Sequence, residues 1–211
     1  MCEKLFLSAS FRDVAELLPG FIDGLPTGKR VTFIPTASLH EKVNFYVKAG
    51  RKSLEKLGFI VDELEISTAS SEEIASKIQG NDVIYISGGN TFFLLQELKR
   101  TGADVLIKEQ IKLGKLYIGE SAGSVIAAPS VSYMQDMDNA SSAKDLDSFD
   151  ALSAVDFYPI PHYTNFPFAK VAAQMVHKYA DLPICPISNR EVILVEKGEK
   201  RVVDVSKEKQ A

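Results

Sequence analysis

The sequence predicts an α/β fold: a doubly wound, mostly parallel sheet that is completed by a C-terminal β-hairpin. Short apolar runs alternate with helical patterns along the chain, and two central runs are apolar without interruption. Two further runs near the C-terminus alternate apolar with polar residues on either side of a short turn. Alternating strands and helices are typical of a parallel sheet with right-handed crossovers, and continuous apolar strands are typical of a sheet covered on both faces.

Five strands are expected in the first part of the chain. They lie in the segments KLFLSAS, RVTFIPTAS, FIVDELEI, DVIYISGG and KLYIG, which begin at Lys4, Arg30, Phe59, Asp82 and Lys115. The continuous runs are those around Val83 to Ile86 and Leu116 to Ile118, so these strands are expected to be buried on both faces. The hairpin is expected in REVILVEKGEKRVVDVS, with its turn at KGEK.

Helices are expected between the strands, because apolar residues recur there at intervals of three, four and seven. One stripe consists of Val43, Tyr46, Val47, Leu54 and Leu57, and a second of Phe92, Leu95 and Leu98. Glycine closes helices readily, and Gly58, Gly102 and Gly114 fall where helices should end. The segment after Pro129 is polar, acidic and poor in periodicity, so we expect a long loop with at most one short helix.

Length and composition fit a single globular domain over residues 1–211. The chain is 45% apolar and 25% charged, and a chain of this size can build a full core without metals or disulfides. Cys2 and Cys185 are too few and too scattered for a disulfide framework or a zinc site. Neither a metal nor a cofactor is therefore expected.

Charge and targeting signals argue against several classes of partner. The net charge is −4 and the basic residues are dispersed, which disfavours nucleic acid as a partner. The N-terminal segment lacks the layout of a secretory signal, and no run reaches the ~18 apolar residues of a membrane span. We therefore expect a cytoplasmic protein with no membrane partner, and a homodimer is left open.

The motif GESAG, residues 119–123, matches the pattern G-x-S-x-G. It follows the strand KLYI and precedes AGSVIAA, the strand-to-helix context in which glycines permit a strained turn that exposes the serine. Ser121 would then lie at a helix N-terminus, where the N–H of Ala122 is a natural donor to an oxyanion. The alternative interpretation is a plain strand-to-helix turn whose glycines serve close packing.

A nucleophilic serine needs a base within hydrogen-bonding reach, and the chain has three histidines. His40 and His177 lie in charged helical segments, which favours surface positions for both. His162 follows the apolar run in FYPIPHYTN, at the expected carboxyl end of a strand, where open α/β sheets place their sites. It is therefore the candidate base, with a structural histidine as the alternative.

Spacing alone does not identify the residue that orients this base. Carboxylates between Ser121 and His162 are abundant, and most of them must be solvated loop charges. The candidates are Asp136 and Asp138, followed by Asp145, Asp147, Asp150 and Asp156.

The segment YISGGNTFFLL, residues 85–95, passes from a strand through two glycines and a polar pair into a helix. It lacks the glycine patterns of dinucleotide sites and phosphate loops. Backbone N–H groups of Gly88 or Gly89 are candidates to complete an oxyanion hole with Ala122, and Asn90 is a candidate substrate contact. A tight packing turn is an equally good interpretation.

Taken together and in this order, SGGNTF, YIGESAGSVIAAP, QDMD and PHYTN resemble the peptidase E family of serine peptidases, which includes aspartyl dipeptidases and cyanophycinases. The resemblance covers most of the chain. It implies a class I glutamine amidotransferase-like α/β fold and a catalytic order Ser-Asp-His. On this basis Ser121 is the expected nucleophile, His162 the base and Asp136 the orienting acid, with Asp138 and Glu120 as alternatives for that acid.

The sequence departs from aspartyl dipeptidases at two positions. After PHYTN it has FPFAKVAAQMVHKY in place of a G-E-T-R segment, whose arginine is expected to grip the substrate carboxylate, and Lys170 lacks the planar fork of arginine. Glu120 stands beside the expected nucleophile where those enzymes carry an apolar aromatic residue. Its charge would repel an acidic side chain and attract a free amino terminus, so aspartate specificity is not carried over.

The sequence thus predicts a serine peptidase of dipeptidase or exopeptidase type, with a short peptide as substrate. An α/β-hydrolase esterase is less favoured, because only 41 positions separate Ser121 from His162. A glutaminase of amidotransferase type would need cysteine at position 121. The alternative of a different class is a non-catalytic binding or regulatory protein that kept the fold, and it is favoured by Glu120, the absent arginine and the acidic loop.

Overall fold

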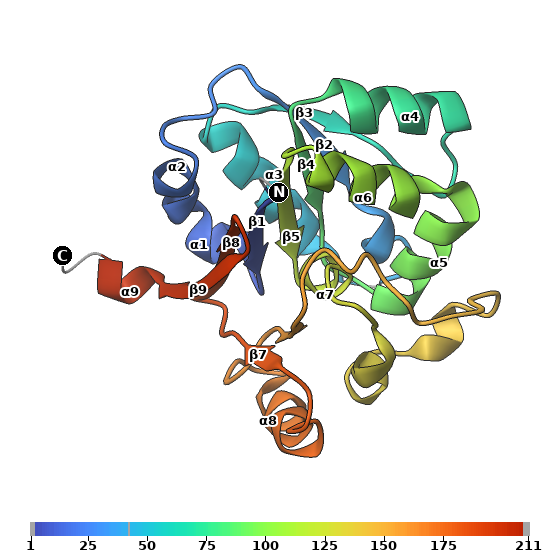
Figure 1. Ribbon diagram of the computed structural model, residues 1–211, viewed down its shortest axis with the longest axis vertical. Coiled ribbons are helices and arrows are strands. Elements are labelled where there is room, and N and C mark those ends of the chain that lie inside the picture. Colours follow the sequence, from blue (N-terminus) through green and yellow to red (C-terminus); the bar gives the residue numbers. More distant parts are fainter. Residues whose placement is uncertain (1–2, 42, 209–211) are drawn as a thin grey trace.

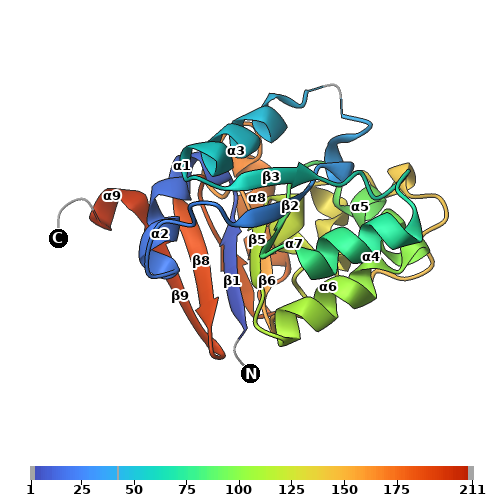
Figure 2. The same ribbon diagram turned by 90° about the horizontal axis from the view of Figure 1, so that it is seen from above.

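The computed structural model describes residues 3–41 and 43–208, and the N-terminal Cys2 lies outside them. Within these residues, seven strands form one sheet and two short strands form another (Figures 1 and 2). The strands are β1 (Lys4–Ser8), β2 (Arg30–Ile34), β3 (Ile60–Glu63), β4 (Val83–Ile86), β5 (Leu116–Glu120), β6 (Tyr158–Ile160), β7 (Ile184–Pro186), β8 (Glu191–Glu196) and β9 (Glu199–Asp204). The α-helices are α1 (Phe11–Val14), α2 (Leu18–Phe21), α3 (Phe45–Lys56), α4 (Ser71–Gly80), α5 (Thr91–Thr101), α6 (Ala103–Lys112), α7 (Ala122–Val125), α8 (Ala169–Lys178) and α9 (Val205–Glu208).

The large sheet has the strand order β3-β2-β4-β5-β1-β8-β9. Strands β1 to β5 pair in parallel, whereas β8 pairs antiparallel with β1 and with β9. The predicted mostly parallel sheet, its five strands and the C-terminal hairpin are therefore confirmed. The register aligns Glu120 of β5 with Ser8 of β1, and Gly119 with Ile86 of β4, so the carboxyl ends of these three strands meet at one edge.

Helices cover both faces of the large sheet, as a doubly wound fold requires (Figure 2). On one face, α1 to α3 enclose a core rich in aromatic rings, among them Phe6, Phe33 and Tyr85. On the other face, α4 to α7 pack over aliphatic residues of β1 and β4 and over Tyr117 of β5. Gly58 and Gly102 have the positive φ values of 96° and 73° that close α3 and α5, as their positions predicted.

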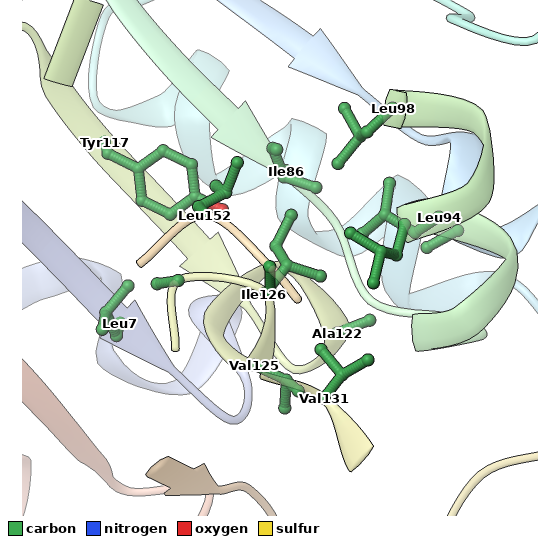
Figure 3. Close-up of a cluster of buried hydrophobic side chains, with 14 of the residues drawn as sticks. Leu7, Ile86, Leu94, Leu98, Tyr117, Ala122, Val125, Ile126, Val131 and Leu152 are labelled. Atoms are coloured by element: carbon green, nitrogen blue, oxygen red, sulfur yellow. The ribbon is translucent and has the colours of Figure 1, made fainter. Parts of the chain in front are cut away.

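The short helix α7 lies within the core on the second face (Figure 3). Val125 and Ile126 pack there with side chains of β1, β4 and α5. The hydroxyl of Tyr117 donates a hydrogen bond of 2.5 Å to the carbonyl of Gly123, and the buried Ser124 donates one of 2.7 Å to the carbonyl of Ser8. These contacts fix the beginning of α7, and with it Ser121, relative to the sheet.

The two-stranded sheet was not predicted, and it lies beyond the edge of the large sheet (Figure 1). Its strands β6 and β7 are parallel and are connected by α8. Tyr133, in a 3₁₀ helix at Ser132–Asp136, attaches this unit to the rest of the chain. Its hydroxyl donates a 2.5 Å hydrogen bond to the carbonyl of Pro159, and its ring makes edge contacts with Tyr158 and Tyr179.

The segment after Pro129 holds two short 3₁₀ helices, Ser132–Asp136 and Ala140–Ser142, where at most one helix was expected. It is packed against the core, because Leu152 is buried and its N–H donates a 2.9 Å hydrogen bond to the carbonyl of Ile126. None of the helices formed by the described residues combines the length and the apolar character needed to traverse a lipid bilayer.

Candidate active site

Ser121 lies in the sharp turn between β5 and α7, as the motif predicted. Its φ and ψ angles are 49° and −108°, a strained conformation for a residue with a side chain. A Cβ atom on Gly119 would lie 2.6 Å from the carbonyl oxygen of Gly123, and a Cβ on Gly123 would lie 2.1 Å from that of Ile86. The glycines of the motif therefore serve close packing, and that packing holds the turn that exposes the serine hydroxyl.

His162 and Ser121 lie in direct contact. Ser121 Oγ is 3.0 Å from His162 Nε2, although the two residues come from different parts of the chain. His162 follows β6 and has a φ of 62°, so it too has a strained backbone conformation. The ring of Phe168 stacks on the imidazole, with 5.1 Å between centroids, and fixes its plane. The pair predicted from the two motifs is thus assembled at the carboxyl edge of the sheet.

The second imidazole nitrogen contacts an amide. His162 Nδ1 lies 2.7 Å from Asn189 Oδ1, in the turn between β7 and β8. The backbone N–H of Asn189 donates a 2.8 Å hydrogen bond to Asn165 Oδ1, which holds that turn in place. Because an amide oxygen only accepts hydrogen bonds, the imidazole proton belongs on Nδ1. Nε2 is then free to accept the proton of the serine hydroxyl.

Burial lowers the pKa of His162 below its ordinary value of 6.5, and the contact with Asn189 opposes this shift. Desolvation disfavours the charged form of an imidazole, and a neutral amide offsets it only in part. The imidazole is therefore neutral at pH 7. This is the protonation state that a general base requires.

The structure does not place the predicted orienting acids at His162. Asp136 lies at the surface, where its carboxylate accepts hydrogen bonds from Lys178 Nζ at 2.7 Å and from the Tyr179 hydroxyl at 2.8 Å. The assignment of Asp136 as the orienting acid is therefore corrected, because its side chain is committed to the end of α8. Within the described residues, the imidazole nitrogens contact only Ser121 and Asn189.

The two alternatives for that acid are also engaged elsewhere. Asp138 accepts a 2.6 Å hydrogen bond from the N–H of Thr91 and one of 2.9 Å from Asn90 Nδ2, at the beginning of α5. Glu120 is 3% exposed and accepts hydrogen bonds from the N–H of Phe11 at 2.9 Å and from the Tyr85 hydroxyl at 2.5 Å. Its burial raises its pKa to about 7. Neither carboxylate contacts His162.

The backbone beside Ser121 offers donors for a developing oxyanion. In the described part of the chain, the N–H groups of Gly88, Gly89 and Ala122 have no hydrogen-bond acceptor. A Cβ on Gly88 would lie 3.1 Å from the Cβ of Ser121, so Gly88 passes directly beside the serine. A Cβ on Gly89 would lie 2.1 Å from the carbonyl oxygen of Ala37, so Gly89 is also required for packing.

Asn90 has a structural role and not the expected role as a substrate contact. Its Oδ1 accepts a 2.8 Å hydrogen bond from the N–H of Phe93, which makes it the N-cap of α5. Its Nδ2 donates to Asp138 and to the carbonyl of Asn139. The side chain is buried and is committed to these contacts.

Ser121 and His162 open into a cavity of about 480 Å³. Its walls come from α1, α3, the loop after β4 and the segment around Phe168, and they combine apolar with acidic side chains. Sequence reasoning missed Asn189, Tyr46 and Arg12 among the lining residues. Asn189 follows no recognisable motif, and Tyr46 was assigned only to the apolar stripe of its helix. Lys170 is not among the lining residues.

Comparison with known proteins identifies the family of this chain. The model of peptidase family S51 matches residues 5–203. An uncharacterized peptidase of Listeria innocua is 55% identical over 198 residues, 93% of this chain and 94% of that protein. Peptidase E of Shewanella baltica is 37% identical over 155 residues, 72% of this chain and 61% of that protein.

A solved structure supports the same relationship. The crystal structure of a candidate peptidase E from Listeria monocytogenes superimposes with a TM-score of 0.92 at 52% identity, covering 97% of this chain and 99% of that one. The predicted class I glutamine amidotransferase-like fold is thereby confirmed. The chain belongs to peptidase family S51, the family of peptidase E.

Proposed function

We propose that this chain is a serine-type peptidase of dipeptidase or exopeptidase type, with Ser121 as nucleophile and His162 as general base. The observation that carries the proposal is the 3.0 Å contact between Ser121 Oγ and His162 Nε2 in a turn built for an exposed serine. The role of Asn189 is to keep the ring proton on Nδ1, as the asparagine of some cysteine peptidases does.

The proposed reaction has two stages. Ser121 Oγ attacks the peptide carbonyl while Nε2 of His162 accepts the hydroxyl proton, and N–H groups of Ala122 and of Gly88 or Gly89 stabilise the oxyanion. The imidazolium then protonates the leaving amine, which breaks the C–N bond and leaves an acyl-enzyme. Water, deprotonated by His162, releases the acid and restores the serine. A cavity of about 480 Å³ matches a small ligand, which favours short peptides over protein chains.

Labelling with a fluorophosphonate probe tests the nucleophile, because only an activated serine reacts. We expect one adduct at Ser121 and none in Ser121→Ala. We also expect Ser121→Ala to lower kcat by roughly 10⁴- to 10⁶-fold while the protein remains folded. Folded protein that gives no adduct would support a non-catalytic binding function instead.

Product analysis tests the reaction class. We expect a library of dipeptides and tripeptides, followed by mass spectrometry, to show trimming of short peptides at one end. Simple esters of the same acyl residues serve as the comparison. Hydrolysis of esters without hydrolysis of any peptide would favour a small-substrate esterase.

A further inference from the structure

Part of the cavity beside Ser121 is enclosed by two helices of the aromatic face of the sheet. Ser10, Arg12 and Asp13 line it from α1 and the residue before it, and Tyr46 lines it from α3. Glu120, which directly precedes Ser121, also lines the cavity. A substrate residue bound to Ser121 would therefore have the Glu120 carboxyl group next to it.

Acidic side chains predominate around this cavity. Asp13, Glu41, Glu120 and Asp138 line it, and in the described part of the chain Arg12 is the one arginine or lysine that does so. The pKa of Tyr46 is raised by its burial and then by the charges of Glu41, Glu120 and Asp138. Three acidic groups thus act on a single phenol, and all three disfavour a negative charge there.

Glu120 is the most deeply buried of these carboxyls, and no cation of the described chain forms an ion pair with it. Its oxygens are held by the Phe11 N–H and the Tyr85 hydroxyl, which fixes the group in place. A buried carboxylate without a cationic partner is costly, and a positively charged ligand would supply that partner.

Resting on the proposed function, we infer that Glu120 is a specificity-determining residue. It makes the cavity select a positively charged group, an ammonium or a guanidinium, on the substrate residue next to the scissile bond, and reject a carboxylate there. Such a group has two sources, the free α-amino group of an N-terminal residue and the side chain of lysine or arginine. This selection is the opposite of a preference for aspartate.

Binding of a cation beside Glu120 should be linked to the protonation of its carboxyl group. The groups that face Glu120 are Arg12 and Asp13 from α1, the Tyr85 hydroxyl from β4 and Tyr46 from α3. Their combined effect with burial leaves the pKa of Glu120 at about 7. A bound cation favours the ionised carboxylate, so binding at pH 7 should release a proton from Glu120, and binding of a lysine or arginine side chain should strengthen toward pH 8.

The test measures binding to Ser121→Ala protein, in which the probes are not cleaved. The probes are lysyl-leucine, leucyl-leucine, aspartyl-leucine and N-acetyl-leucyl-leucine, titrated by calorimetry at pH 8. Either source predicts that aspartyl-leucine binds more weakly than leucyl-leucine. A side-chain source predicts that lysyl-leucine binds roughly tenfold or more tighter than leucyl-leucine, and an α-amino source predicts the same advantage of leucyl-leucine over its acetylated form.

Two variants in the Ser121→Ala background separate charge from structure. Glu120→Gln removes the charge and should abolish the preference for the cationic probe. Tyr85→Phe removes a hydrogen bond to the same carboxyl but keeps its charge, and should retain the preference. Thermal unfolding checks that both variants fold. Proton release at pH 7, measured in two buffers of different ionisation heat, gives a readout that does not depend on either variant.

The inference is overturned if aspartyl-leucine binds as tightly as the cationic probe. It is also overturned if binding releases no proton. Failure of every probe to bind also overturns it. None of these results touches the proposed function, which is tested separately by labelling of Ser121. Conversely, the probe could fail to label Ser121 while the protein still binds cations selectively. Glu120 would then be the selectivity residue of a binding protein.

Discussion

Asn189 Oδ1 lies 2.7 Å from His162 Nδ1, where many serine hydrolases place a carboxylate. An amide orients the imidazole and selects its tautomer, but it carries no charge to stabilise the imidazolium. Burial therefore governs the pKa of His162, which lies below 6.5. The imidazole, which is the proposed general base, therefore stays neutral to a lower pH than it would beside an aspartate.

Replacing this amide by an acid should shift the pH profile. In Asn189→Asp, a carboxylate beside Nδ1 favours the imidazolium and raises the pKa of His162 by about one unit or more. Because the neutral imidazole is the active form, the acid limb of the kcat/KM profile should move to higher pH by the same amount. Asn189→Ala should keep the low midpoint and lower kcat by roughly 10²- to 10⁴-fold. An acid limb that stays in place in Asn189→Asp would contradict the assignment of Asn189 as the orienting residue.

The raised pKa of Glu120 should appear in the stability of the fold. At pH values below its ordinary pKa of 4.5 the carboxyl is protonated in both states, so its contribution to the folded state is complete. As the pH rises from 4.5 to about 7, the unfolded chain ionises and the folded chain does not, so the free energy of unfolding falls by about 3 kcal/mol in total. Above the folded pKa the decrease should stop.

Glu120→Gln serves as the reference for this effect. Urea unfolding of both proteins between pH 4.5 and 8 gives the difference in unfolding free energy, and contributions from other groups such as His162 cancel in that difference. We expect the wild-type protein to lose stability relative to the variant over this range. A difference that does not change with pH would show that Glu120 titrates normally.

Asp136 should act as a positioning residue. It joins the 3₁₀ helix Ser132–Asp136 to the end of α8 through Lys178 and Tyr179, and so attaches the unit that carries His162. The ion pair is at the surface, with side-chain exposures of 33% for Asp136 and 57% for Lys178, so Asp136→Ala should cost about 1 kcal/mol or less. kcat should fall because His162 is held less firmly, while the midpoint of the acid limb stays unchanged. A shifted midpoint would restore Asp136 to a direct role at the base.

The parts of the site that sequence predicted are those with a local signal. The glycines on both sides of Ser121, together with the strand and helix around it, predict its position. The apolar run before His162 predicts the position of that residue. Asn189 has no such signal, because its contact with His162 depends on how β7 and β8 bring a turn back to the small sheet. A strand was expected before His162, where β6 lies, but the small sheet itself was missed, because β7 has three residues and is too short for a periodic pattern.

Glu120 and Asp136 show a second limit of sequence reasoning. Asp136 was the orienting acid that the family resemblance implied, and Glu120, which directly precedes Ser121, was an alternative for that acid. The groups that donate hydrogen bonds to these carboxylates are distant in the chain. They are Phe11 and Tyr85 for Glu120, and Lys178 for Asp136. The direction of a side chain at the edge of a sheet is decided by such partners and not by the local pattern.

The turn that carries Ser121 should depend on the absence of a side chain at Gly123. In Gly123→Ala the added methyl group would lie 2.1 Å from the carbonyl oxygen of Ile86, and neither backbone can move without displacing β4 or the beginning of α7. We expect a loss of about 2–3 kcal/mol in unfolding free energy and a loss of Ser121 labelling, because the turn that exposes the serine is distorted. Gly20→Ala is the control, since a methyl group there meets nothing within 4 Å beyond its chain neighbours and the backbone of its own helix, and α2 should gain about 0.5–1 kcal/mol. Gly123→Ala protein that keeps wild-type stability and labelling would show that the close approach of α7 to β4 is not what holds Ser121 in place.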